Sequence, residues 1–282
     1  MARAKLTAAH MKIAGLHLYA ALAAAATLLL VVTGADAASR ETEPAGGHRA
    51  VAAVVGVLII GLVAWLMFVE KRSWLRGLGW IALAGVAAEC GLGVWAAPAS
   101  PMTCMAHAFL APLLLSVVVA ILVGTSGSWR HDPVWLQDQG WPSLRGVARN
   151  TLVVVVIQVA LGAAFRYGSI NVMTHILGAL VVAIFILTLV VLVTLMPEHP
   201  TLRPAAITLG VVTFVQIFLG LTVVSMGSAN AAKPMVAAFA VAHVTTGAVV
   251  LSTTLVVALE TWRNVRSASE SAEAGSDQGL IS

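Results

Sequence analysis

The sequence predicts an all-α polytopic membrane protein, with eight transmembrane helices arranged as two parallel-repeat four-helix bundles. Of its 282 residues, 60% are hydrophobic and only 10% are charged, whereas soluble domains carry about 25% charged residues. A membrane-spanning helix needs about 20 mainly apolar residues, and the chain has eight stretches of about this kind. They cover residues 13–33, 49–69, 78–97, 105–125, 151–166, 172–196, 205–226 and 236–259.

The basic residues predict the orientation of these spans. Twelve of the 16 lysine and arginine residues fall on the side of the N-terminus, and four fall on the other side. Because cytoplasmic loops carry the excess of basic residues, we expect a bacterial-type inner-membrane protein with both termini in the cytoplasm. The net charge of +4 says little about nucleic acid, because the basic residues stand in short loops beside apolar spans. We expect the lipid bilayer as a partner and no nucleic acid.

The longest inner loop, residues 125–149, divides the chain into two halves. We predict an N-terminal four-helix bundle over residues 1–126, a cytoplasmic linker over 127–148 and a C-terminal four-helix bundle over 149–262. Residues 263–282 are rich in Ser, Ala, Glu and Gly, a composition typical of a disordered tail.

A histidine stands at the N-terminal end of every second span. These are His48, His107, His175 and His243, and alternating spans would place all four at similar depth near the outer face. Neutral imidazole is a common metal ligand, and a six-coordinate heme iron takes two of them. A single histidine at a helix end is more often an interfacial polar residue, but the repetition favours two pairs that each hold one heme.

A second pattern precedes three of the histidines. Residues 89–93, 158–162 and 216–220 begin with Glu or Gln and end with Gly. Glycine there lets a helix or a flat macrocycle approach the backbone closely, although ordinary helix packing explains any single motif equally well. The repetition of both patterns across the central loop indicates a duplication whose two halves have the same orientation.

Together these residues resemble the heme A synthase family of cytochrome oxidase assembly proteins. The resemblance covers nearly the whole chain, and includes His48-Arg49 and the Gln-x-x-Leu-Gly of the fifth and seventh spans. It implies that His175 and His243 hold a heme b cofactor. It implies that His48 and His107 hold the second heme, either heme O as substrate or another heme b. It further implies an oxidoreductase that converts a methyl group of heme O into a formyl group for cytochrome oxidase biogenesis.

The resemblance also implies partners. They are a quinol or another electron partner and, in the same membrane, a heme O synthase or a terminal oxidase complex. Arg49 and Arg166 fall near the outer face and could bind heme propionates. As interfacial arginines they would need no partner.

One departure from the family concerns catalysis. Family members carry a glutamate three residues before the histidine of the second span, where this chain has Ala45. The candidate replacements are Glu43, in the preceding loop, and Glu89, the most deeply placed acid of the first half. An ionisable group at membrane depth is a functional candidate, but Glu89 could also be a hydrogen-bonded carboxyl that replaces the Gln of the other motifs.

The alternative function is a non-catalytic diheme b-type cytochrome or an oxidase-associated subunit of the same fold. A third function, a transporter, lacks the expected broken helices and midplane charges.

The two cysteines, Cys90 and Cys104, flank the outer turn between the third and fourth spans. The outer compartment permits a disulfide, and we predict one that clamps the turn before His107. The alternative is two unpaired thiols that behave as small apolar residues. Family members also carry a cysteine pair in the first outer loop, which is absent from residues 35–47.

Overall fold

The chain is an all-α integral membrane protein, as the sequence predicts. The computed structural model describes residues 2–40, 46–95, 100–138, 140–229 and 232–266. Within these ranges, eight helices are long and apolar enough to cross a membrane. They are α1 (Ala2–Arg40), α2 (Gly46–Val69), α3 (Ser73–Trp95), α4 (Pro101–Thr125), α5 (Leu144–Arg166), α6 (Val172–Leu195), α7 (Leu202–Ser228) and α8 (Lys233–Asn264).

Polar capping residues fix the start of three helices. Ser100, Ser143 and Asn171 stand before α4, α5 and α6, and each side chain accepts from the backbone N–H three residues later. Such a cap satisfies a donor that has no partner within the helix. Because Ser143 is the cap, α5 begins at Leu144. The predicted linker over residues 127–148 is therefore wrong at its end, which is the first turn of α5.

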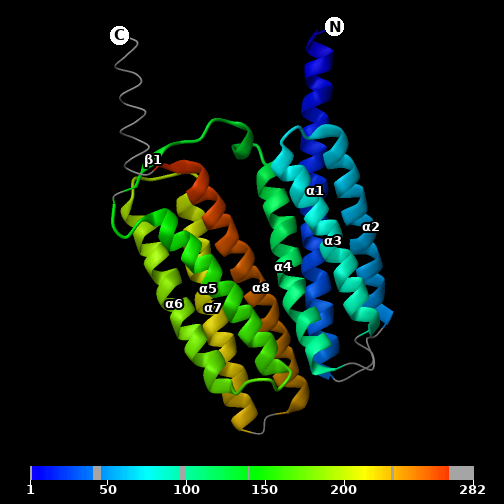
Figure 1. The fold of residues 1–282 in the computed structure, drawn as a ribbon, viewed down its shortest axis with the longest axis vertical. Helices are drawn as coiled ribbons and strands as arrows, with labels where there is room; N and C mark the ends of the chain where they lie inside the picture. The colour runs from blue at the N-terminus through cyan, green and yellow to red at the C-terminus, as the bar shows by residue number, and fades with distance from the viewer. Residues whose placement is uncertain (1, 41–45, 96–99, 139, 230–231, 267–282) are drawn as a thin grey trace.

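The helices pack as two four-helix bundles, one from each half of the chain (Figure 1). In the first, α1 to α4 pack in sequence and α4 closes onto α1; α5 to α8 repeat this arrangement. The bundles meet where α8 packs on α1 and α4, and where α5 packs on α4. Each bundle has its own buried apolar core, with a small third cluster between them around Val31, Leu115 and Ala248.

The two bundles bury equivalent positions. Ser116 of α4 and Ser252 of α8 each lie nine residues after the histidine of their helix, and their hydroxyl oxygens are 3.1 Å apart. Equal positions of two repeats meet in this way when a two-fold axis relates them. The buried faces of α2 and α6 also share one spacing: Val55, Ile59, Leu62 and Leu66 in α2, and Val182, Ile186, Leu189 and Val193 in α6.

The loop between the bundles is fixed to both of them. Its described residues include the 3-10 turn η1 (Ser128–Arg130). Trp129 Nε1 donates to Glu260 Oε1 of α8 at 2.6 Å, and Arg72 Nη1, from the turn between α2 and α3, donates to the Trp129 carbonyl at 3.2 Å. The loop therefore ties α8 to the α2–α3 turn.

A short parallel strand pair follows in the same loop. Strand β1 (Leu136–Gln137) pairs with β2 (Val265–Arg266), directly after α8. The predicted disordered tail is therefore wrong for residues 263–266, which end α8 and form β2. Residues 267–282 lie outside the described part of the chain.

Candidate functional site

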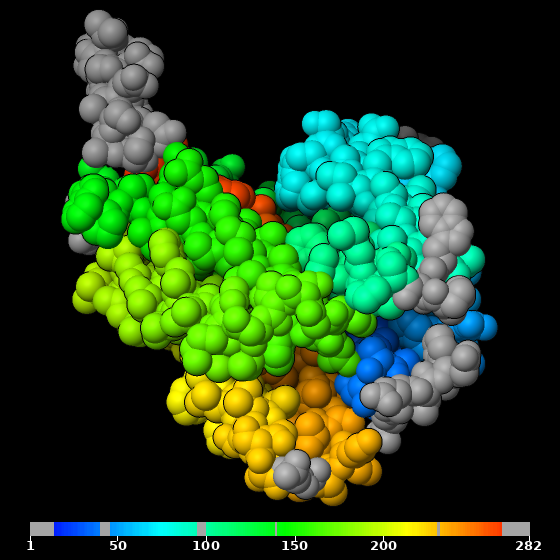
Figure 2. Space-filling view, turned by 60° about the horizontal axis from the view of Figure 1, so that its bottom comes forward, coloured from blue at the N-terminus to red at the C-terminus, as the bar shows by residue number. Residues whose placement is uncertain are grey.

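The four predicted histidines lie at one end of the molecule, in the first three turns of α2, α4, α6 and α8. This end is at the bottom of Figure 1, opposite the loop that joins the bundles. Figure 2 brings the same end forward and shows the green residues of α5 against the start of α4. The two bundles therefore touch at the end that carries the histidines.

The structure brings the histidines together as two pairs. The ring centroids of His48 and His107 are 6.4 Å apart at an interplanar angle of 88°. Those of His175 and His243 are 6.3 Å apart at 85°. In each bundle the paired helices are not packed neighbours but lie on a diagonal, so the rings meet in the middle of the four helices.

Each imidazole packs against a glycine of the preceding helix. A Cβ built on these glycines would meet the Cε1 atom of the ring. Glycine is needed where this contact is tightest, because any side chain would occupy the place of the imidazole. The pairs and their Cβ–Cε1 distances are Gly34–His48 at 3.1 Å, Gly93–His107 at 3.6 Å, Gly162–His175 at 3.2 Å and Gly220–His243 at 2.8 Å.

In the first bundle, a side chain of the preceding helix also meets Nδ1 of each ring. Thr33 Oγ1 lies 3.1 Å from His48 Nδ1. Glu89 Oε2 forms an ion-pair contact with His107 Nδ1, and the Glu89 residue is only 8% exposed. The carboxylate of Glu89 is thus directed at a histidine and replaces the Gln of the other motifs at the same place.

In the second bundle, the groups that meet Nδ1 are neutral. Gln158 Nε2 lies 3.1 Å from His175 Nδ1 and donates to the His175 carbonyl at 2.9 Å. His243 Nδ1 lies 3.2 Å from the Gln216 carbonyl oxygen, and the Gln216 amide nitrogen lies 3.3 Å from Nε2 of the same ring. An amide can offer either its donor or its acceptor end to an imidazole.

The distance between ring centroids fits a metal held between two imidazoles, although the Gln216 amide would have to leave Nε2 of His243 for this ring to bind one. A bond of about 2.0–2.1 Å from metal to nitrogen, plus about 1.1 Å from nitrogen to ring centroid, separates the centroids by about 6.2–6.4 Å. An edge-to-face aromatic pair can have similar spacing. However, such a pair needs neither the glycine contact nor a polar partner on Nδ1, and all four histidines have both.

Each pair offers two imidazoles, and two is the number of axial ligands that a heme iron takes. Among the described residues, no group of three or more His, Cys, Asp or Glu side chains could hold a metal ion. Zinc takes at least three protein ligands, whereas a heme iron needs only two axial ones because the macrocycle supplies the rest. The His107 side chain keeps 30% of its surface exposed.

The other predicted site residues do not contact the histidine rings in the described part of the chain. Glu43 and Ala45 lie outside the described residues. Arg49 is exposed at the start of α2. Arg166, at the end of α5, donates from Nη2 to Ser39 Oγ of α1 at 2.9 Å, so it joins the two bundles.

The structure also adds residues that the sequence did not single out. Thr33 and Gly34 contact the His48 ring. Phe165 stacks on His175, with centroids 5.9 Å apart and an interplanar angle of 10°. Gly34 could have been found in the sequence from its spacing. It precedes His48 by 14 residues, and Gly93 precedes His107 by the same number.

The predicted disulfide between Cys90 and Cys104 is not formed, because both cysteines are free thiols. The reason lies in the helix geometry, since consecutive side chains of an α-helix point about 100° apart. Glu89 points into the bundle toward His107, so its neighbour Cys90 is exposed on the outside of α3.

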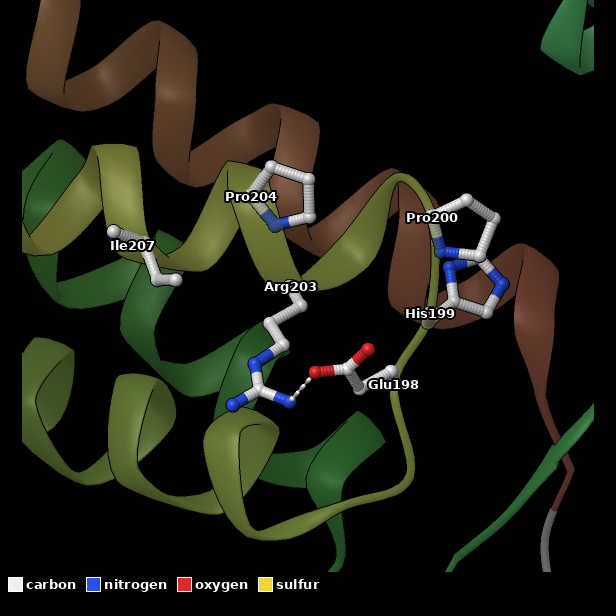
Figure 3. A pocket seen from close by; sticks show the side chains of 6 residues that line it. All are labelled: Glu198, His199, Pro200, Arg203, Pro204 and Ile207. Atoms are coloured by element: carbon white, nitrogen blue, oxygen red, sulfur yellow. Dashed lines mark hydrogen bonds and ion pairs between the residues drawn. The ribbon is translucent and has the colours of Figure 1, made fainter.

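A surface pocket of about 460 Å³ lies at the other end of the molecule, at the start of α7 (Figure 3). In it, Arg203 Nη1 donates to Glu198 Oε1 at 2.9 Å. His199 beside it is buried, with Nε2 3.1 Å from the Val134 carbonyl, so this histidine holds the loop between the bundles. The pocket belongs to neither histidine pair.

Comparison with protein-family models and with curated proteins found no match to this chain.

Proposed function

We propose that this membrane protein binds two hemes, one in each four-helix bundle, and that it modifies one of them as heme A synthases do. The observation that supports the proposal most strongly is the meeting of four histidines as two diagonal pairs with centroids 6.4 and 6.3 Å apart. When bound, a heme would supply iron that changes oxidation state. The chain would supply two axial imidazoles and an apolar surrounding.

The residues around the histidines would hold the rings in place for this task. The glycine contact sets how deeply each imidazole enters the bundle, and the group on Nδ1 fixes its rotation. Outer contacts of this kind orient a metal-binding histidine and fix which nitrogen carries the proton. For His48, His107 and His175, Nε2 is then the nitrogen that faces a ligand.

The two bundles would have different roles. Neutral groups meet both histidines of the second bundle, which suits a permanently bound heme b on His175 and His243. The first bundle would hold heme O as its substrate on His48 and His107. Glu89 is the candidate proton acceptor there, together with Glu43.

The second candidate function is a diheme electron carrier that takes electrons from a quinol and serves a terminal oxidase complex. One observation favours it: the Glu89 carboxylate is already engaged with His107, whereas a general base must reach a substrate proton.

Removing histidines tests the heme sites. We expect His175→Ala or His243→Ala to remove the low-spin b-type spectrum of the second bundle, while His48→Ala or His107→Ala removes that of the first. His131→Ala is the control, because the imidazole of this exposed histidine bonds the Gly127 carbonyl in its own loop, away from both histidine pairs. An unchanged reduced-minus-oxidised spectrum in the first four variants would refute the ligand assignment.

Product analysis separates the two functions. The protein would be produced with a heme O synthase in a host that lacks its own heme A synthase, and the extracted hemes would be separated by chromatography. Heme A from the wild type supports the synthase, and heme O alone from a protein that still carries low-spin heme supports the electron carrier.

We further propose that both termini are cytoplasmic in a bacterial-type inner membrane, with the heme sites toward the outer face. The end opposite the histidines carries Arg72, Arg130 and Arg263 around Trp129, as expected of a cytoplasmic end. Reporter fusions to each terminus test this orientation, and an externally active reporter would contradict it.

A further inference from the structure

One of the four histidines differs from the others in the charge of its Nδ1 partner. His48 has a hydroxyl, His175 an amide and His243 a backbone carbonyl. Only His107 has a carboxylate, from Glu89. The two bundles therefore share the arrangement of their ring pairs and differ by one ionisable group.

The surroundings of Glu89 leave His107 as the group that its carboxyl contacts. The residue is 8% exposed, and its second oxygen, Oε1, is buried without a hydrogen-bond partner among the described residues. No lysine or arginine forms an ion pair with it in the described ranges, where His107 is its ion-pair partner. A buried carboxylate needs a compensating positive charge nearby. A cation bound by His107 would lie close enough to provide it.

An iron bound by His107 would supply that charge. Oxidised iron carries one unit more positive charge than reduced iron, and a nearby negative charge in a low-dielectric interior stabilises the more positive state. A carboxylate on Nδ1 also makes the imidazole a more basic ligand. Both effects act in the same direction and lower the reduction potential.

We infer that Glu89 is a positioning residue that acts through His107 to give the heme of the first bundle a lower reduction potential than the heme of the second. This inference depends on the proposed binding of two hemes, but not on heme A synthesis. The order of reduction follows: the second bundle is reduced first in a titration. Transfer of one electron from a heme held by His48 and His107 to a heme held by His175 and His243 would then be favourable.

The test is a spectroscopic redox titration of the purified full-length protein, in which His175→Ala assigns the remaining signal to the first bundle. Glu89→Gln keeps a side chain of the same shape that can still accept from Nδ1, but it removes the charge. We expect it to favour the reduced form of the first-bundle heme by about tenfold in the equilibrium constant. For one electron, this corresponds to a reduction potential about 59 mV higher. The second-bundle potential should stay unchanged.

The matched reverse variant is Gln158→Glu, which places a carboxylate on His175 Nδ1. We expect it to lower the potential of the second-bundle heme and to leave the first unchanged. It also keeps the inference testable if Glu89→Gln loses its heme.

Three outcomes are distinguishable. Opposite shifts in the two variants support the inference. Two bound hemes whose potentials move in neither variant overturn it and leave the proposed heme binding intact. A wild-type protein without heme overturns both.

Discussion

Each histidine of the two pairs rests on a glycine and is held at Nδ1 by the same preceding helix. At the scale of single residues, the site is therefore a unit of three parts: imidazole, glycine and polar partner. The glycine contact is graded, from 2.8 Å at Gly220 to 3.6 Å at Gly93. Real Cβ atoms essentially never lie within 3.0 Å of another heavy atom, as a Cβ at Gly220 would. Substitution by alanine should therefore disturb Gly220 more than Gly93.

We expect Gly220→Ala to displace His243 and lower the heme content of the second bundle. Gly93→Ala should keep the heme of the first bundle, because 3.6 Å is an ordinary van der Waals contact. Gly227→Ala in the same helix as Gly220 is the control, since its Cβ would meet nothing within 4 Å. The heme-to-protein ratio is the measurement, and equal ratios for Gly220→Ala and Gly227→Ala would contradict the prediction.

Helix existence was predictable from the sequence, but helix ends were not. All eight spans were expected, because apolar runs of sufficient length leave a chain few alternatives in a bilayer. The ends depend on groups that hydropathy ignores: Ser143 starts α5 before its apolar run, and α8 continues past Glu260 because that carboxylate is buried by partners from the loop. The four histidines could be predicted because they recur at the start of every second span, whereas Thr33 could not. The equivalent of Gln158 in α1 is Leu30, so this helix lacked the sequence pattern of the others.

The turn between α2 and α3 has an ion pair of its own. Glu70 is 8% exposed, and its carboxylate accepts from Arg72 Nε at 3.0 Å and from Arg72 Nη2 at 2.8 Å. Burial acts to raise the pKa of Glu70, but the hydrogen bonds and charge of Arg72, with the backbone N–H of Lys71, outweigh it and lower the pKa from 4.5 to about 2.

This lowered pKa predicts a pH-dependent stability. Since the folded pKa lies below the unfolded one, ionised Glu70 stabilises the fold fully above about pH 4.5, and the stabilisation is lost as the pH falls toward 2. Its size is on the order of 1–2 kcal/mol after screening by water at the helix end. We expect Glu70→Gln to lower the unfolding free energy in detergent at pH 7 and to flatten its decline between pH 4.5 and 2. Glu198→Gln, whose side chain is 87% exposed, is the control, and a parallel decline in wild type and Glu70→Gln would contradict the assignment.

At the scale of the whole molecule, the two repeats are joined at both ends. Near the histidines, Arg166 of α5 bonds Ser39 of α1. In between, Ser116 and Ser252 bond across the pseudo-symmetric contact of α4 and α8. At the opposite end the repeats lose their symmetry, because a single loop runs between them and its Trp129 donates to a buried acceptor of the second bundle. That acceptor is Glu260.

The network around Glu260 should determine how firmly the loop holds the bundles together. Glu260 is 3% exposed and accepts from Trp129 Nε1 at 2.6 Å, Asn264 Nδ2 at 2.9 Å and Thr201 Oγ1 at 2.5 Å. Trp129→Phe removes the indole N–H and leaves a buried carboxylate oxygen without its donor, at a cost of about 1–3 kcal/mol. We therefore expect faster limited proteolysis of the loop in Trp129→Phe than in the wild type. The change should not affect the heme content, because the histidine pairs lie at the other end of the helices.

The chain offers a matched control for this variant in the same loop. Trp141 is 97% exposed, so Trp141→Phe makes the same chemical change without removing a buried donor. It should leave the cleavage rate at the wild-type value. If both tryptophan variants were cleaved equally fast, the Trp129–Glu260 bond would not be what holds the loop. If Trp129→Phe also lost heme, the two ends of the bundles would be coupled through α8, which carries both Glu260 and His243.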